Sequence, residues 1–476
     1  MQLTEELIRG VVAEVIAGLR TGKSSAPATV VTPSNNWGVF QSVDDAVSSA
    51  TKSQKELERR GIEDRAKATE CIRKICFEQR EQLGREEFDE TKIGRLEHKI
   101  DKLIAVAKRI PGVEFLRTNA FSGGNGVSLE EFAPFGVIGA ITPVTHSLPT
   151  LAGNAINMLA AGNAMVVNPH PSAARIACRG VQLFNQAIAR EIGIDSLITI
   201  IEKPTLETAN AIFDHRGVSL LCVTGGPAVA RAALRSPKRA IVAGPGNPPV
   251  VVDETADLDN AARSIIAGAS YDNNLLCIGE KEVFVVDSVF DELFDALTRA
   301  KAVRLNEKEI AALTKAAFVP ADGDAGKLVV NKDLIGKDAA VLAQHGGKAA
   351  PADTLMAFGE TTADHPFVDH EQMMPFVPFV RVKDVEQGIA LAKKYEHGFR
   401  HTSIIHSRNI ETITHMGREM QTTLYIQNGP CTAGLGVGGE GYLSFSIATP
   451  TGEGVTTPMT FTRQRRSTTV GAMRVL

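Results

Sequence analysis

The sequence is poor in aromatic residues and has no pattern of metal-binding residues. Aromatic side chains make up 5% of the 476 residues, whereas 42 of the residues are glycine. Small side chains let helices lie close to a sheet, which favours a layered α/β protein. The cysteines form no CxxC pair and no His-rich tract accompanies them, so we expect no metal site. The six cysteines are Cys71, Cys76, Cys178, Cys222, Cys277 and Cys431.

A strong positive charge is also absent. The formal net charge is −4 and the isoelectric point is near 6.3. A nucleic-acid-binding protein needs a basic surface, so we expect no nucleic-acid partner. One short basic cluster, Arg463, Arg465 and Arg466, lies among threonines. We predict that it belongs to a solvated or subunit-facing strand.

The N-terminus lacks the apolar run of a secretory signal, because Glu5, Glu6, Arg9 and Glu14 fall within it. Residues 132–174 contain no Asp, Glu, Lys or Arg and resemble a membrane span. Prolines and asparagines interrupt that stretch, however, and would leave polar groups unpaired in lipid. A buried strand–helix–strand unit explains it better. We therefore expect a soluble protein with reduced cysteines in the cytoplasm, and no membrane segment.

Residues 1–20 form a segment of their own. Apolar residues recur there at helical spacing and make a single stripe, formed by Leu3, Leu7, Ile8, Val11, Val12, Val15, Ile16 and Leu19. Residues 21–36 are rich in Ser, Thr, Pro and Asn without any period, which indicates a linker. A tethered helix cannot easily bury its stripe on its own domain, so we predict a helix that docks on another protein. The alternative is that it folds back and packs.

The rest of the chain is too long for one ordinary domain, and its pattern divides into two α/β sets. Residues 42–108 are helical and charged. Apolar strands then alternate with helices, which indicates parallel, doubly wound sheets. The predicted strands are residues 136–142, 164–170, 197–202, 219–226 and 239–244 in the first set, and 248–253, 280–287, 378–382 and 423–428 in the second. We therefore predict two doubly wound α/β domains.

Two further segments have the pattern of strands outside these sheets. Residues 119–135 hold Ser-Gly-Gly-Asn-Gly between two extended stretches, which is typical of a β-hairpin, and residues 456–470 are rich in Thr and Arg. We predict that they form a β arm exchanged between subunits. Gly434, Gly436 and Gly439 spell GxGxxG, but no helix is predicted after them. We interpret them as a loop lining an acyl or CoA channel.

Cys277 is the candidate nucleophile. It lies in a predicted loop between a helix and a strand, in the sequence Asn273-Asn274-Leu275-Leu276-Cys277-Ile278-Gly279. Loops on a rigid scaffold present catalytic groups, and the neighbouring residues offer N–H donors to a developing oxyanion. We predict that the backbone N–H of Cys277 is such a donor.

From about residue 37 onward the chain resembles the aldehyde dehydrogenase superfamily. Seven motifs occur in the family's order: TPVTHSLPT (142–150), NAINMLAAGNAMVVNPHPSA (154–173), VTGG (223–226), AGPGNPPVVV (243–252), CIGEKEVFVV (277–286), EQMMPFVPFVRV (371–382) and ATPTGEGVT (448–456). The resemblance implies a nicotinamide cofactor domain at residues 37–243 with an oligomerisation hairpin at about 118–134, and a catalytic cysteine domain at residues 244–432. Residues 433–476 would return to the cofactor domain and add oligomerisation strands, in a homodimer or homotetramer.

The family's chemistry depends on the cysteine. Its thiolate attacks the aldehyde, a hydride passes to the nicotinamide, and a thioacyl-enzyme remains. Hydrolytic members activate water with a Glu at the position of Ala243, 34 residues before Cys277. Loss of a general base typically costs about 10² to 10⁴ in rate, which disfavours hydrolysis. A thiol needs less help than water, so the resemblance implies release of the acyl group to coenzyme A.

The residues in these motifs are similar to those of CoA-acylating aldehyde dehydrogenases of bacterial microcompartments. These act on propionaldehyde or acetaldehyde, and they often carry an N-terminal helix that targets the enzyme to the shell lumen. That implies a shell-protein partner for residues 1–20 and a location inside a microcompartment. The branch usually has Pro before the cysteine, where this chain has Leu276. We expect propionaldehyde as substrate. The alternatives are acetaldehyde, an acyl-phosphate reductase, or a non-enzymatic microcompartment scaffold.

The resemblance also implies how the cofactor is held. Residues expected near it are Thr142, Pro143, Asn168, Pro169, His170, Thr224, Gly225, Gly226, Ala243, Gly244 and Glu371. Gly225 and Gly226 open a helix beneath the diphosphate, where N-terminal N–H groups bind anions. Glu371 would hold the nicotinamide ribose. Thr145 stands where relatives place an oxyanion-holding Asn and is a second catalytic candidate. NAD is expected, with NADP left open because Asn168 replaces a Lys of hydrolytic relatives.

Overall fold

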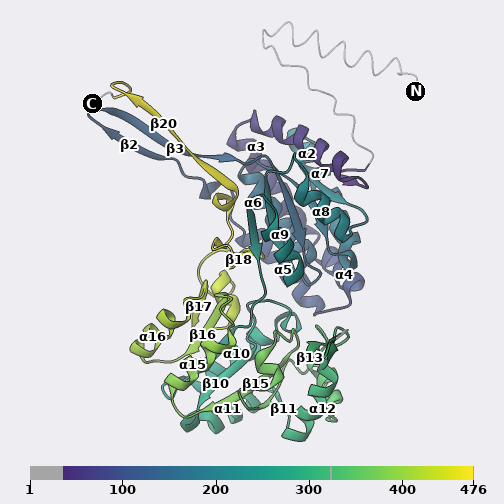
Figure 1. The fold of residues 1–476 in the computed structure, drawn as a ribbon, viewed down its shortest axis with the longest axis vertical. Helices are drawn as coiled ribbons and strands as arrows, with labels where there is room; N and C mark the ends of the chain where they lie inside the picture. The colour runs from purple at the N-terminus through teal and green to yellow at the C-terminus, as the bar shows by residue number, and fades with distance from the viewer. Residues whose placement is uncertain (1–35, 322–323, 475–476) are drawn as a thin grey trace. The chain divides into compact units, whose positions relative to one another are not determined.

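The computed structural model describes residues 36–321 and 324–474. The predicted helix at residues 1–20 and all of the predicted linker except Asn36 lie outside the described residues. Within the described residues, none of the helices combines the length and the apolar content needed to cross a bilayer. Figure 1 shows the arrangement of the helices and strands.

The first sheet consists of six parallel strands in the order β1-β6-β5-β4-β7-β8. Their bounds are Val39–Phe40 (β1), Ile198–Ile201 (β6), Ala164–Pro169 (β5), Val137–Thr142 (β4), Leu220–Thr224 (β7) and Ala240–Ala243 (β8). Strands β4 to β7 are buried along their whole length, as expected when helices cover both faces of a parallel sheet.

The chain order of these strands creates a switch point. From β4 the chain moves outward through β5 and β6, and then returns to β7 on the other side of β4. Connections leave β4 and β7 in opposite directions, so a crevice opens beyond their carboxyl ends, where doubly wound sheets bind ligands. Thr142 ends β4 and Thr224 ends β7. Two predicted cofactor-binding segments therefore lie at the switch point.

Helices surround the first sheet. Four precede the sheet's long strands, namely α2 (Val43–Glu58), α3 (Ile62–Glu78), α4 (Arg80–Thr91) and α5 (Leu96–Arg109). The others follow individual strands, namely α6 (Ser147–Ala160), α7 (Ala174–Ile192), α8 (Leu206–Asp214) and α9 (Pro227–Arg235). Helices α2 and α7 pack on β6, and α3 packs on α5, α6 and α7. Helix α5 thus belongs to an outer layer, yet it carries two buried lysines, Lys99 and Lys102.

The second sheet has seven parallel strands in the order β11-β14-β15-β10-β9-β16-β17. Their bounds are Val303–Arg304 (β11), Ala357–Glu360 (β14), Phe376–Val382 (β15), Glu282–Val286 (β10), Pro249–Val252 (β9), Thr402–His406 (β16) and Leu424–Gln427 (β17). Its helices are α10 (Leu258–Ala269), α11 (Asp287–Arg299), α12 (Glu307–Ala317), α13 (Ala339–His345), α14 (Pro366–Asp369), α15 (Val385–Tyr395) and α16 (Ile410–Met420). The prediction of an α/β architecture with two parallel sheets is confirmed.

A separate antiparallel sheet forms an arm. Strands β2 (Asn119–Gly123) and β3 (Gly126–Pro134) make the predicted hairpin, and β20 (Thr462–Val470) runs beside β3 over nine paired residues (Figure 1). Every residue of β2 is exposed, as is β20 after its first residue. The basic cluster of the tail therefore lies on an exposed strand. The role of this arm in oligomerisation stays a prediction.

Several elements were absent from the sequence-based prediction. The strands β1 and β11 have two residues each, too few to show an alternating pattern. The hairpin β12 (Phe318–Ala321) and β13 (Asp324–Val330) and the short pair β18 (Ile447–Ala448) and β19 (Gly454–Val455) were also missed. As predicted, no α-helix follows the glycines after Cys431 in the described part of the chain. A 3₁₀ turn at Cys431–Leu435 is followed by irregular backbone.

Candidate active site

Cys277 lies between α10 and β10, in the predicted loop. A short 3₁₀ segment, Tyr271–Asn274, precedes it and β10 begins five residues after it. The loop is almost wholly buried, and Cys277 itself is half-buried between the buried side chains of Leu276 and Ile278. The backbone N–H groups of Cys277 and Ile278 hydrogen bond to its sulfur. Both donors therefore favour the thiolate form of the sulfur, and the oxyanion role of the Cys277 N–H stays a prediction.

Gly246 is the meeting point of the candidate site. A Cβ atom at this position would lie 2.4 Å from the carbonyl oxygen of Cys277 and 3.0 Å from Cγ of His401, so only glycine fits there. The backbone N–H of Gly246 also hydrogen bonds to Glu371. The loop after β8 thus brings together the predicted nucleophile, the predicted ribose-binding carboxylate, and a histidine that no motif had indicated.

His401 is buried completely. Its Nδ1 lies 2.9 Å from Oγ1 of Thr402, and its backbone N–H donates to Glu396. Its Nε2 has no hydrogen-bond partner among the described residues. Burial, together with the nearby positive charge of Lys281, lowers the pKa of His401 to about 4. The ring is neutral at physiological pH, so its free nitrogen can accept a proton.

Lys281 is a second residue that the sequence did not reveal. Its ammonium group is fully buried and donates to the carbonyl oxygens of Asn274 (2.9 Å) and Leu276 (3.3 Å), and also to the side chain of Asn274. These bonds hold the loop directly in front of Cys277. Its charge also opposes protonation of His401 and favours ionisation of Cys277 and Glu371.

The thiol of Cys277 is protonated in the resting protein. Burial raises its pKa to about 12, and the negative charge of Glu371 adds to this shift, while Lys281 and the two backbone N–H groups oppose it only in part. Burial also raises the pKa of Glu371. A thiolate is the reactive form of cysteine. The nucleophile therefore needs a proton acceptor, and His401 is a neutral imidazole next to the same loop.

This assignment predicts a steep pH dependence for the reactivity of Cys277. Alkylation by iodoacetamide should rise about tenfold per pH unit between about pH 7 and pH 9, because the thiolate fraction grows by that factor below the pKa. The measurement is the second-order rate of label incorporation at Cys277, with Cys277→Ala as the blank. A rate that levels off below pH 9 would contradict the raised pKa.

Thr145 contacts a buried histidine and a buried lysine. Its Oγ1 lies 2.8 Å from Nδ1 of the buried His146, and its carbonyl oxygen accepts a hydrogen bond from Lys99 (2.7 Å). The pKa of His146 is lowered by burial and by the two neighbouring lysines, so this ring is neutral. Either Thr145 or the ring can be the donor in this contact, so the oxyanion role of Thr145 stays a prediction.

The predicted diphosphate site has the required shape. Helix α9 begins at Gly226 and no side chain caps its N-terminus. A Cβ atom built on Gly225 or Gly226 would meet nothing within 4 Å, so both residues face open space. Thr224, at the end of β7, is held by Ser446, with 2.7 Å between their hydroxyl oxygens. Uncapped N–H groups facing an open space fit a bound diphosphate.

The other predicted cofactor residues lie at strand ends of the first sheet. Thr142 ends β4 and is followed by Pro143, and Asn168 and Pro169 end β5. The Asn168 side chain accepts a hydrogen bond from Thr208 (2.6 Å) and donates to the carbonyl of Thr205, both in the capping box of α8. Its amide is used inside the protein, which leaves backbone atoms for contact with a ribose.

Three predicted residues remain to be placed. His170 follows β5, is exposed, and its ring accepts the backbone N–H of Ser172. Ala243 ends β8, and Gly244 follows it. Residue 246 contacts Cys277, and three residues span at most about 11 Å of chain, so Ala243 lies within that distance of the contact. The end of β8 therefore lies near the candidate site and carries no acidic side chain.

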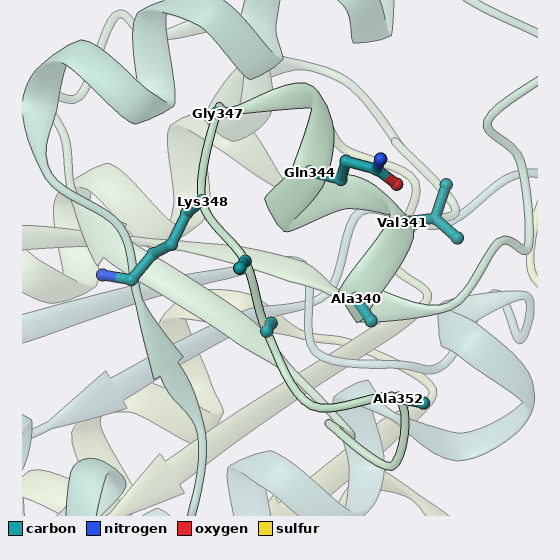
Figure 2. Close-up of a pocket in the computed structure, with 8 residues that line it drawn as sticks. Ala340, Val341, Gln344, Gly347, Lys348 and Ala352 are labelled. Carbon is teal, nitrogen blue, oxygen red and sulfur yellow. The ribbon is translucent and has the colours of Figure 1, made fainter.

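A surface hollow of about 520 Å³ lies elsewhere. Figure 2 shows its lining, which comes from α13 and the loop after it and includes Gln344, Lys348 and several alanines. None of its lining residues is a predicted site residue, so the hollow has no part in the chemistry at Cys277. Across residues 36–321 and 324–474, no group of three or more His, Cys, Asp or Glu side chains is arranged to hold a metal ion.

Comparisons with known proteins identify the family of the chain. The model of the aldehyde dehydrogenase family matches residues 38–442. The acetylating acetaldehyde dehydrogenase EutE of Salmonella typhimurium is 43% identical over 475 residues, which cover 100% of both chains. The structure of Rhodopseudomonas palustris propionaldehyde dehydrogenase with bound CoA and an acylated cysteine is 41% identical, with a TM-score of 0.89 over 92% of this chain and 99% of that one.

A third match comes from a microcompartment. The propionaldehyde dehydrogenase of the Clostridium phytofermentans fucose utilisation bacterial microcompartment is 38% identical, with a TM-score of 0.89 over 92% of this chain and 100% of that chain. The chain therefore belongs to the aldehyde dehydrogenase family. Within the family it is similar to CoA-acylating enzymes along its whole length, which confirms the resemblance inferred from its motifs.

Proposed function

We propose that this chain catalyses the CoA-dependent oxidation of a short aliphatic aldehyde to acyl-CoA, with reduction of NAD. The observation that carries the proposal is the arrangement around Gly246. The Cys277 loop, the neutral ring of His401 and Glu371 meet there, while Ala243 at the nearby strand end offers no base for water. A cysteine that can be acylated but not efficiently hydrolysed needs another acceptor for its acyl group.

The first step forms a bond between the sulfur of Cys277 and the aldehyde carbon. The thiol proton passes to the free Nε2 of His401, and the carbonyl oxygen takes the negative charge. The backbone N–H groups of Cys277 and Ile278 stabilise that oxyanion, and Lys281 holds the loop that presents them. When bound, the nicotinamide accepts the hydride that leaves this carbon. A thioester on Cys277 remains.

The second step regenerates the free thiol of Cys277. The thiol of coenzyme A gives up its proton to neutral His401 and attacks the thioester carbon, and the bond from that carbon to Cys277 breaks. The released sulfur takes that proton back, and the proton that His401 accepted in the first step passes to solvent before CoA reacts, so one proton is released for each NADH formed. The second step is reversible because one thioester replaces another.

The cofactor-binding residues of the proposal follow from their places in the fold. The diphosphate lies at the N-terminus of α9 near Gly225 and Gly226, which is supported by the open, uncapped helix end. Backbone atoms around Asn168 and Pro169 contact the adenosine ribose, and Glu371 holds the nicotinamide ribose. Assaying both nucleotides decides between NAD, which we propose, and NADP.

Propionaldehyde is the proposed substrate, with acetaldehyde as the alternative. Both are supported by what relatives are named for: the Salmonella enzyme for acetaldehyde, and the Rhodopseudomonas and Clostridium enzymes for propionaldehyde. Leu276, buried next to Cys277, contributes to the apolar wall near the acyl group. Relative kcat/KM values for the two aldehydes test this preference.

The experiment that tests the function compares NADH formation from propionaldehyde with and without CoA. Turnover should require CoA, and phosphate should not replace it. One molecule of acyl-CoA should form for each molecule of NADH. Equal turnover without CoA would mean that water reaches the thioester despite Ala243, and the proposed acceptor would be wrong.

We further propose that the enzyme resides in the lumen of a bacterial microcompartment as a homo-oligomer, with the arm β2-β3-β20 joining subunits and residues 1–20 bound to a shell protein. The microcompartment relative supports this location. Deletion of residues 1–20 should leave kcat and KM unchanged but abolish co-sedimentation with purified shells. A deletion variant that still co-sediments, or that folds but loses activity, would contradict the separation of targeting from catalysis.

A further inference from the structure

The backbone directly before Cys277 is in an unusual conformation. Asp272, Asn273 and Asn274 all have positive φ angles, of 50°, 55° and 65°. None of the three is glycine, and all three are fully buried. Left-handed backbone is unfavourable for residues with a side chain, and it persists only where surrounding contacts over-determine it. This left-handed turn (residues 272–274) therefore requires anchors.

Two of its side chains are anchored within the second sheet's part of the chain. Nδ2 of Asn273 donates to the carbonyl oxygen of Gly336 (2.9 Å) and to the carboxylate of Asp338 (2.8 Å). Nδ2 of Asn274 donates to the carbonyls of Ala269 and Glu280, both at 2.9 Å. These bonds hold the second and third residues of the turn in place.

The third side chain, Asp272, is anchored on α5. One of its oxygens accepts hydrogen bonds from Lys102 and from Lys99 (3.2 Å), and the other accepts the backbone N–H of Arg95 (2.8 Å). The backbone N–H of Asp272 donates to Nδ1 of His98 (2.8 Å). All three charged groups are fully buried, so this ion cluster is shielded from solvent. The turn is thus tied to a helix that precedes it by 170 residues or more.

The same cluster reaches the loop after β4, which carries Thr145. Besides Asp272, Lys99 donates to the carbonyl oxygen of Thr145 at 2.7 Å. One ammonium group therefore bridges the turn before Cys277 and the loop after β4. A further buried carboxyl, that of Glu87 on α4, lies near enough to interact with the charges of the two lysines and Asp272, and neither of its oxygens has a hydrogen-bond partner among the described residues. The cluster holds both loops in fixed positions.

We propose that Asp272 is a positioning residue for Cys277, acting through its buried ion pairs with Lys99 and Lys102. The cluster holds the left-handed turn in its conformation, and the turn determines the position of the backbone N–H groups at Cys277. The hydrogen bond from Lys99 fixes the position of the Thr145 loop relative to them. The proposal rests on Cys277 being the nucleophile. An apolar filling could stabilise a buried site equally well, so a charged cluster adjacent to the nucleophile serves geometry rather than stability.

The test uses Asp272→Asn, which keeps the size of the side chain and removes its charge. Misplacing a reacting group by about 1 Å costs roughly 10²-fold, so kcat should fall by about 10- to 100-fold while KM for CoA changes by less than about threefold. The alkylation rate of Cys277 by iodoacetamide at one fixed pH should fall as well. Lys102→Arg keeps the ion pair and should retain most of both rates.

Two further variants keep the test decisive. The double variant Lys102→Met with Asp272→Asn removes one charge of each sign and so keeps the net charge of the Asp272, Lys99 and Lys102 cluster, and it is measured if the single variant does not fold. Asp259→Asn is the matched control, because Asp259 forms an exposed ion pair with Arg299 (2.7 Å) away from the site. It should change neither kcat nor the alkylation rate.

The outcomes separate positioning from stability. If the folded variants have a lower melting temperature but an unchanged kcat and alkylation rate, the cluster is merely structural and the proposal is wrong. A drop in both rates in folded protein supports it. Alkylation does not depend on the overall reaction, so it still reports on the turn if the enzyme proves to use an acceptor other than CoA.

Discussion

Cys277→Ala is expected to lower CoA-dependent aldehyde oxidation by a factor on the order of 10⁴ or more, since removal of a covalent nucleophile costs that much in comparable enzymes. The remaining backbone donors can bind the carbonyl oxygen, but no thioester can form without the sulfur. The measurement is NADH formation at saturating aldehyde and CoA, with intact folding checked by the thermal melt. Acyl transfer from acyl-CoA in the reverse direction should disappear to the same extent.

The matched control for this variant is Cys71→Ala. Cys71 is also half-buried, but it lies on α3, outside the candidate site. Its replacement should leave kcat within about twofold, as is usual for substitutions away from special features. A Cys277→Ala enzyme that retains a tenth of the parent activity would rule out covalent catalysis by this residue, and with it the central part of the proposed function.

Much of the fold could be predicted from the sequence because its main strands are apolar along their whole length. Residues Val137–Thr142 and Ala164–Pro169, for example, differ from the predicted strands by one residue at an end. Strand β16 was missed because Thr402–His406 carries polar residues at both ends, although all five are buried. Its pairing with β17, the next strand along the chain, and with β9, which lies about 150 residues earlier, identifies it as a strand.

The candidate site was predicted in part. Cys277, Glu371 and the glycines before α9 belong to motifs, and the structure brings the first two together at Gly246. Lysines are almost always exposed, so nothing in the sequence marks Lys281 or the pair on α5 as buried. Their burial depends on carbonyls and a carboxylate that only the folded chain places beside them. His401 was missed for the same reason, because its contact with the Cys277 loop runs through another segment.

Ala243→Glu is the second substitution with a large expected effect, because it adds the carboxylate that this chain lacks at position 243. A carboxylate at the end of β8 would lie within about 11 Å of chain from the Gly246 contact with Cys277, which is within reach of a water between them. A general base typically contributes about 10² to 10⁴ in rate, so turnover without CoA should rise by about 10²-fold or more. The measurement is NADH formation without CoA, with the carboxylic acid product quantified.

Ala243→Gln is the matched control, because it fills the same space without a basic oxygen. Ala243 is buried, so both variants place a polar group in a buried position, and the folding of each is checked by its melting temperature. Hydrolysis in the Glu variant alone means that the acyl acceptor is decided by a base at this strand end. Equal hydrolysis in both means that added bulk lets water in, and neither rising means that the loop at Gly246 shields the thioester from water. In either of the last two cases the preference for CoA is a matter of access rather than of a missing base.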